Sequence, residues 1–224
     1  MLTRILEPEV MDTAEEARDY DSMDHSGVNR VFVDDLLVAA TNAGLSLSSV
    51  EMLDLGTGTA QIPIELCRRA DGAKIVAIDL AEEMLKLARL NVEAASLLDR
   101  IRLERVDGKR LPYANGMFAA VISNSIVHHI PEPRSVLAEA LRVVRPGGLI
   151  FIRDLLRPAD DATVRRLVDA YAAGANDHQR FLLDASLRAA LSLGEIRELV
   201  ASFGFSPDMV EATSDRHWTW SVRR

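Results

Sequence analysis

The chain has 224 residues, 48% of them hydrophobic, and a formal net charge of −8 at pH 7. No apolar run approaches the 18 residues of a membrane span, and the single Cys67 excludes an internal disulfide. Because nucleic-acid affinity depends on many Lys and Arg side chains, the acidic balance disfavours a nucleic-acid partner and favours a small molecule.

The N-terminal region is expected to be a helical cap over residues 1–45, without a membrane partner. Its first eight residues lack the apolar core of a secretory signal, which makes the cytoplasm the expected location. Residues 27–43 carry apolar side chains at helical spacing. Polar side chains crowd residues 20–30, just before this helix, where the chain is expected to close over a bound ligand.

Residues 50–66 read as a buried strand that runs through a two-glycine turn into an amphipathic helix. Gly56 and Gly58 lack a Cβ, so a ligand can approach the backbone amides and the helix N-terminus. Asp79 ends the next strand, about 20 residues later, where a doubly wound sheet presents a carboxylate to ribose hydroxyls. Gln61 replaces the third small residue of the dinucleotide fingerprint, so NAD and FAD are disfavoured.

The pattern Asp54, Gly56, Gly58 resembles the first motif of the class I S-adenosylmethionine-dependent methyltransferases, with Ala60 where the family usually has a third glycine. Three later segments continue the resemblance. Residues 101–108 resemble the family's third strand, which ends in an acidic residue, here Asp107. Residues 117–124 resemble the family's fourth strand, which opens toward the substrate. Residues 142–154 resemble the family's helix end, Pro-Gly-Gly turn and fifth strand. The ordered set covers residues 50–154.

The resemblance implies a doubly wound, mostly parallel seven-stranded α/β sheet with helices on both faces and an antiparallel C-terminal hairpin. We expect a single domain over residues 1–224, whose cofactor-binding core is 50–154. Residues 155–191 depart from the minimal fold and are expected to form a helical lid. Residues 192–224 should supply the last helix, which Ser192 and Glu195 begin with a capping box, and the terminal strands.

The activity implied by the resemblance is methyl transfer from S-adenosyl-L-methionine to a small-molecule acceptor by in-line displacement. The implied cofactor-binding residues are Tyr20, Asp54, Gly56, Thr57, Gly58, Asp79, Leu80, Asp107, Gly108 and Asn124. The candidate substrate contacts are His25, Asn29, Ser125, Arg153 and Asp154. His128 and His129 follow the strand that should face the reacting centre, and a neutral imidazole near pH 7 can remove a proton from the acceptor.

Several alternatives stay open at this stage. His128 and His129 could have purely structural roles. A metal site is not expected, because adjacent side chains usually diverge and no other His or Cys cluster lies near them in the sequence. The acceptor could instead be a protein or RNA, or the chain could be a catalytically silent S-adenosylmethionine-binding protein that regulates a partner. A homodimer is also open.

Overall fold

The computed structural model describes residues 2–8 and 12–224, so residues 1 and 9–11 of the expected N-terminal cap lie outside the described residues. The chain divides into two compact units. One, here the glycine-turn unit, contains the described residues of 10–124 with 135–152 and 221–224. The other, here the histidine unit, contains the described residues of 1–9 with 125–134 and 153–220.

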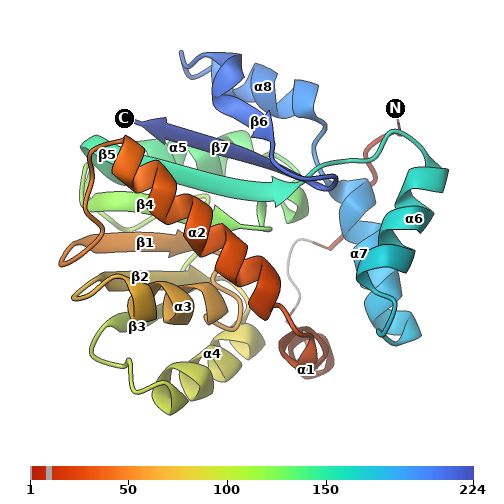
Figure 1. The fold of residues 1–224 in the computed structure, drawn as a ribbon, viewed down its shortest axis with the longest axis horizontal. Coiled ribbons are helices and arrows are strands. Elements are labelled where there is room, and N and C mark those ends of the chain that lie inside the picture. Colours follow the sequence, from red (N-terminus) through yellow and green to blue (C-terminus); the bar gives the residue numbers. More distant parts are fainter. Residues whose placement is uncertain (1, 9–11) are drawn as a thin grey trace. The chain divides into compact units, whose positions relative to one another are not determined.

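The sheet has the strand order β3-β2-β1-β4-β5-β7-β6 (Figure 1). Strand β1 pairs in parallel with β2 and β4, β2 pairs in parallel with β3, and β6 pairs antiparallel with β7. The predicted seven-stranded α/β fold with an antiparallel C-terminal hairpin is thereby confirmed. The strands are β1 Glu51–Leu55, β2 Lys74–Asp79, β3 Ile101–Arg105, β4 Phe118–Asn124, β5 Val144–Leu155, β6 Val210–Ala212 and β7 His217–Arg223.

Helices cover both faces of the sheet in the glycine-turn unit, with α2 and α3 in front of the strands and α5 behind them (Figure 1). A core of fully buried side chains, including Phe32 and Leu36 of α2 and Val92 of α4, packs on Met52 and Ile75 of the strands. Each such side chain contributes about 1.5–3 kcal/mol by leaving water. The helices are α1 Ala14–Ser22, α2 Ser26–Asn42, α3 Gln61–Arg69, α4 Glu82–Ala94 and α5 Arg134–Val143.

Helix α1 lies within the helical cap predicted for residues 1–45, but the sequence analysis gave it no bounds of its own. A capping box starts it: the Thr13 side chain accepts from the backbone N–H of Glu16, whose carboxylate accepts from Thr13 in return. The helix is polar overall, and Ala17 is its only fully buried residue. Its weak apolar periodicity explains why the sequence pattern did not show its bounds, and its consequence is that Tyr20 lies on a helix.

The parallel register fixes which residues share an edge of the sheet. Leu55 pairs with Ile78 of β2 and with Ser123 of β4, while Asp79 pairs with Arg105 of β3. Because the carboxyl ends of parallel strands meet at one edge, the residues that follow these strands emerge together. This edge is where ligands bind in doubly wound sheets.

The histidine unit contains the insertion that was predicted over residues 155–191. Helices α6 (Asp161–Tyr171) and α7 (Asp177–Ala189) pack on a small apolar core that includes Val164 and Leu187. Helix α8 (Leu193–Ala201) begins with the expected Ser192–Glu195 capping box. The unit also contains two short 3-10 helices, η1 (Val127–His129) and η2 (Pro207–Met209). Covering the substrate stays a predicted role for residues 155–191.

The described helices include none with the length and apolar character needed to cross a membrane.

Candidate functional site

The turn after β1 is held against the end of β2 by its own backbone. Gly56 and Gly58 have φ angles of 70° and 54°, in the left-handed region that glycine enters without a Cβ penalty. The Thr57 N–H donates to the Ile78 carbonyl at 2.8 Å, and the Gly58 N–H donates to Asp79 Oδ2 at 2.8 Å. The strand-end carboxylate predicted from the sequence therefore contacts the turn directly.

Asp79 is oriented through both of its oxygens. While Oδ2 accepts from Gly58, Oδ1 accepts from the Ala81 N–H at 2.9 Å, at the start of α4. Two backbone donors thus fix the plane of the carboxylate and bring the first turn of α4 to the same edge. A ligand bound at this edge of the sheet would therefore meet a carboxylate whose orientation is already fixed.

Ala60, which stands where the resembled motif has its third glycine, has a φ of 63° and is fully buried. A Cβ in this region costs about 1–2 kcal/mol. Ala60→Gly removes that cost but loses the burial of a methyl group, about 0.8 kcal/mol. It also raises the conformational entropy of the unfolded chain, which destabilises the folded state. We therefore expect almost no change in the free energy of unfolding.

Ala88→Gly, inside α4, is the matched control for this prediction because Ala88 is also fully buried. There the substitution has no strain to remove, and we expect a loss of about 2 kcal/mol. Urea denaturation of both variants measures the difference. Equal losses at the two positions would show that Ala60 carries no backbone strain.

A cavity lies beside the turn within the glycine-turn unit. Its lining is Tyr20, His25, Asn29, Asp54, Gly56, Thr57, Thr59, Gln61, Ile62 and Asn124. The buried polar atoms of the lining that find no hydrogen-bond partner among the described residues include Thr59 Oγ1, Asn124 Oδ1 and His25 Nε2. Since buried polar atoms are nearly always hydrogen-bonded, these three indicate that a polar ligand completes the site.

Tyr20 covers the turn in this structure. A Cβ placed on Gly58 would lie 3.7 Å from Tyr20 Cε1, and the Tyr20 and His25 rings are 4.7 Å apart. The cavity encloses about 360 Å³ including its open mouth, and Tyr20 is one of the residues that line it.

The electrostatics of the cavity favour a cation. Burial, together with the nearby charge of Asp79, raises the pKa of Asp54 to about 7, while a hydrogen bond with Thr57 acts in the opposite direction. Burial also raises the pKa of Tyr20 to about 12 and lowers the pKa of His25, so both stay neutral near pH 7. A bound positive charge would stabilise the Asp54 carboxylate, which fits the sulfonium and ammonium groups of S-adenosylmethionine.

The structure brings together most of the residues predicted to bind cofactor or substrate on this side. His25 and Asn29, predicted as substrate contacts, line the same cavity as Tyr20. Asp107 does not: its Oδ1 accepts from the Lys109 N–H at 2.9 Å. The predicted cofactor contacts that lie outside the cavity lining are Gly58, Asp79, Leu80, Asp107 and Gly108. Their roles as cofactor contacts stay predictions.

Sequence reasoning missed three lining residues, Thr59, Gln61 and Ile62. They follow the glycine turn and enter the first turn of α3, where backbone N–H groups have no partner within the helix. The sequence signal that could have identified these residues is their position, directly after the glycine turn and at the predicted start of the helix.

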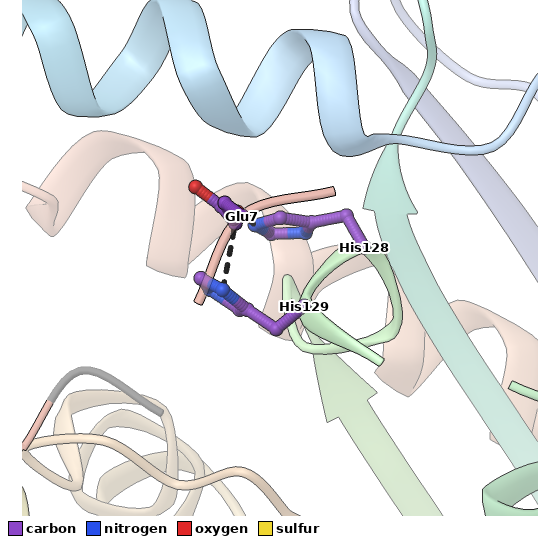
Figure 2. A group of neighbouring side chains, drawn as sticks. All are labelled: Glu7, His128 and His129. Atoms are coloured by element: carbon purple, nitrogen blue, oxygen red, sulfur yellow. Dashed lines mark ion pairs between the residues drawn. The ribbon is translucent and has the colours of Figure 1, made fainter. Parts of the chain in front are cut away.

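In the histidine unit, the two predicted catalytic side chains lie side by side (Figure 2). The rings of His128 and His129 are 4.1 Å apart, with planes 35° from each other. Both face Glu7: His128 Nε2 lies 3.4 Å and His129 Nδ1 3.1 Å from Glu7 Oε1. The expectation that adjacent histidines diverge is wrong here, because the tight η1 turn directs both rings to one side.

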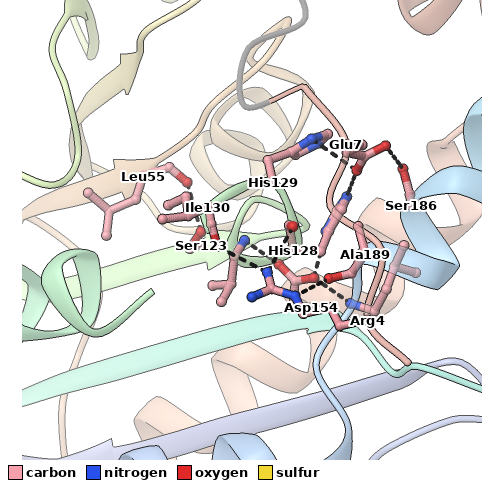
Figure 3. A network of polar contacts seen from close by, with 12 residues as sticks. Arg4, Glu7, Leu55, Ser123, His128, His129, Ile130, Asp154, Ser186 and Ala189 are labelled. Atoms are coloured by element: carbon pink, nitrogen blue, oxygen red, sulfur yellow. Dashed lines mark hydrogen bonds and ion pairs between the residues drawn. The ribbon is translucent and has the colours of Figure 1, made fainter. Parts of the chain in front are cut away.

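Asp154, predicted as a substrate contact, is the buried partner of His128 (Figure 3). Its Oδ1 lies 2.7 Å from His128 Nδ1, and the backbone N–H groups of Val127 and Leu155 also donate to its carboxylate. Burial alone would raise the pKa of Asp154, but His128 and these donors lower it. Burial alone would lower the pKa of His128, but Asp154 and Glu7 raise it above its ordinary value.

The other two predicted substrate contacts are engaged within the histidine unit. Arg153 is buried, and its Nε donates to Thr219 Oγ1 at 2.9 Å. The Ser125 N–H donates to the Arg153 carbonyl at 2.9 Å, and Ser125 has a φ of 60°. Substrate contact stays a prediction for both residues.

Comparison with known proteins agrees with this geometry. Residues 53–152 match a family described as a methyltransferase domain. The chain is 29% identical over 161 residues to a ubiquinone biosynthesis O-methyltransferase of Xanthomonas oryzae pv. oryzae (strain PXO99A), covering 70% of this chain and 66% of that protein. It is 37% identical over 121 residues to a demethylmenaquinone methyltransferase of Deinococcus radiodurans, covering 54% of this chain and 49% of that protein.

The fold is also similar to that of a solved methyltransferase structure. An S-adenosylmethionine-dependent methyltransferase from Aquifex aeolicus superposes with a TM-score of 0.67 at 16% identity, covering 93% of this chain and 97% of that one. At this identity the likeness shows the fold, and the chain spans less than two-thirds of these two sequence relatives. Residues 53–152, which include the glycine turn and the strand-end acids, are thus similar in sequence to a methyltransferase domain, and the fold is that of a solved S-adenosylmethionine-dependent methyltransferase.

Proposed function

We propose that the protein transfers a methyl group from S-adenosylmethionine to a small-molecule acceptor. The observation that carries this proposal is the cavity beside the glycine turn, where an acid with a raised pKa and unpartnered polar atoms surround bare backbone. This donor and acceptor set suits a cofactor that is both cationic and rich in hydrogen-bonding groups.

The cavity residues and Asp79, which contacts the glycine turn from the end of β2, have distinct roles in this proposal. Asp79, oriented by two amides, meets the ribose hydroxyls, and Asp54 offsets positive charge. Thr59 and Asn124 supply hydrogen bonds to polar groups of the ligand, and Tyr20 closes the site against water. When bound, the cofactor supplies a methyl group on a sulfonium sulfur. Alignment of the reactants can then provide about 7–11 kcal/mol of the rate enhancement.

The names of the relatives support a small-molecule acceptor, since they refer to ubiquinone biosynthesis and to demethylmenaquinone. We propose an acceptor of that general kind, an aromatic ring with hydroxyl or open carbon positions, and a cytoplasmic location. The net charge of −8 is consistent with this choice over RNA. His128 and His129 stay our candidates for removing a proton from the acceptor.

A methyl-transfer assay tests the proposal. The purified chain is incubated with methyl-labelled S-adenosylmethionine and either a demethylmenaquinol, a hydroxylated benzoquinol or a cell lysate separated by size. Label in the quinols or in the small-molecule fraction supports the proposal. Label confined to protein or RNA would identify a macromolecular acceptor, and cofactor binding without any transfer would identify a silent regulatory protein.

Asp79→Ala is expected to weaken binding of S-adenosylmethionine at least tenfold, about 1.4 kcal/mol. The substitution removes the carboxylate that meets the ligand and also releases the Gly58 and Ala81 amides. Calorimetric titration measures the affinity, with thermal unfolding as a check that the variant is folded. Asp71→Ala, in the exposed turn before β2, is the control. Unchanged affinity in folded Asp79→Ala would contradict the assignment.

A further inference from the structure

The cluster formed by Glu7, His128 and His129 has the composition of a metal site. It offers one carboxylate oxygen and two imidazole nitrogens, and the three atoms lie within 4.8 Å of one another. Two of the separations are 3.1 and 3.4 Å, both to Glu7 Oε1. Ligands about 2.0–2.2 Å from a tetrahedral Zn²⁺ lie about 3.3–3.5 Å from each other, so these spacings match.

The short distances within the cluster are not hydrogen bonds. Glu7 Oε1 and His129 Nδ1 are buried, and neither has a hydrogen-bond partner among the described residues although they lie 3.1 Å apart. The Glu7 side chain is 10% exposed, and that of His128 only 3%. The carboxylate oxygen and the two imidazole nitrogens are thus held close together with little access to water, and a cation between them would be stabilised by all three. Figure 2 shows both rings turned toward Glu7.

Groups around the cluster orient two of the three ligands. His128 Nδ1 is hydrogen-bonded to Asp154 at 2.7 Å, which directs the free Nε2 toward Glu7. The Ser186 hydroxyl donates to Glu7 Oε2 at 3.2 Å, which leaves Oε1 for the cluster. A histidine whose second nitrogen binds a carboxylate is the usual arrangement around bound zinc.

The segment that carries Glu7 is anchored independently of any ligand. Arg4 donates to the carbonyls of His128 and Ile130 at 3.1 and 3.0 Å and to that of Ala189 at 2.6 Å (Figure 3). The Ile5 N–H donates to the Arg188 carbonyl at 3.1 Å. These bonds bring residues 4 and 5 onto η1 and the end of α7, so Glu7 reaches the histidines without further ordering of the chain.

We propose that Glu7, His128 and His129 bind one divalent transition-metal ion of the Zn²⁺ class. The set of two histidines and one carboxylate matches the three protein ligands of zinc sites that keep a fourth position open. Binding releases any proton held on His128 Nε2 or His129 Nδ1, because a metal ligand must present its lone pair. A bound metal would occupy nitrogen lone pairs that His128 and His129 would need to accept a proton, so this proposal is an alternative to their role as bases.

The test uses the full chain without a histidine tag, treated with a chelator and then dialysed free of it. Zn²⁺ is titrated by calorimetry against a competing chromophoric chelator, and Co²⁺ is added separately to record its visible ligand-field bands. We expect one Zn²⁺ per chain and Co²⁺ bands typical of four or five ligands. Because the metal binds the native state, Zn²⁺ should also raise the melting temperature, and a chelator should reverse this rise.

Glu7→Gln and His129→Asn are the variants that identify the ligands, since both side chains lie nearer the surface than His128. Each should weaken Zn²⁺ binding at least tenfold and abolish the Co²⁺ bands, while the protein stays folded. His178→Asn, an exposed histidine of α7, is the matched control and should bind like the wild type. Absence of stoichiometric binding, or binding unchanged in both variants, would show that the cluster is an ion-pair network only and overturn the proposal.

Discussion

Asp154→Ala is expected to lower the free energy of unfolding by about 3–5 kcal/mol. The substitution leaves His128, which is 3% exposed, without the nearer of its two carboxylate partners, because only Glu7, 3.4 Å from Nε2, remains. It also leaves the backbone N–H groups of Val127 and Leu155 without their acceptor. Each unsatisfied buried group adds about 1–3 kcal/mol of desolvation cost. Urea denaturation, with the midpoint and slope fitted together, gives the change.

Two further variants make this prediction specific. Asp154→Asn keeps an acceptor oxygen and should lose less stability than the alanine variant. Asp71→Ala, in an exposed turn, should change stability by no more than about 0.5 kcal/mol. If Asp154→Ala were as mild as Asp71→Ala, the buried network in Figure 3 would not contribute to the stability of the fold.

Asp54→Asn is expected to change how stability depends on pH. The pKa of Asp54 is raised to about 7 in the folded protein, while the unfolded chain has the ordinary value near 4. Between these two values the folded state binds the proton more tightly, so the unfolding free energy of the wild type falls as pH rises. The full fall attributable to Asp54 is about 4 kcal/mol, and an amide at this position contributes none of it.

Urea denaturation of wild type and Asp54→Asn at pH 5 and pH 8 measures this effect. The stability of the wild type relative to the variant should fall by about 2–4 kcal/mol over this range. Asp71→Asn serves as the control, and its difference from wild type should stay flat. A constant difference between wild type and Asp54→Asn would mean that the buried carboxyl titrates near its ordinary pKa.

Much of the fold could be predicted because its signals are local. Strands β1, β2 and β4 contain short buried runs, and α4 repeats buried residues every fourth position, at Met84, Ala88 and Val92. Such periodicities report which face of an element is buried without reference to the rest of the chain. The bounds of helix α1 were missed for the same reason, since only Ala17 of its nine residues is fully buried.

The candidate site was predictable where it follows the chain and not where it joins distant segments. The glycine turn and Asp79 were visible because a strand, a turn and a strand end occur in a fixed order. The contact of Glu7 with His128 and His129 could not be predicted, because no local sequence pattern indicates which distant residues residue 7 will contact. The Tyr20 ring over Gly58 likewise depends on how α1 packs.

The sequence by itself indicated the bare backbone at the turn and the acids at the strand ends, since these follow from the pattern of buried strands and glycines along the chain, and the family resemblance implied the seven-stranded sheet. Only the tertiary structure decided that Asp154 holds His128, that Glu7 meets both histidines and that Ala60 adopts a left-handed conformation. The physical reason is that hydrogen bonds and ion pairs act over about 3 Å in space, whatever the distance along the chain.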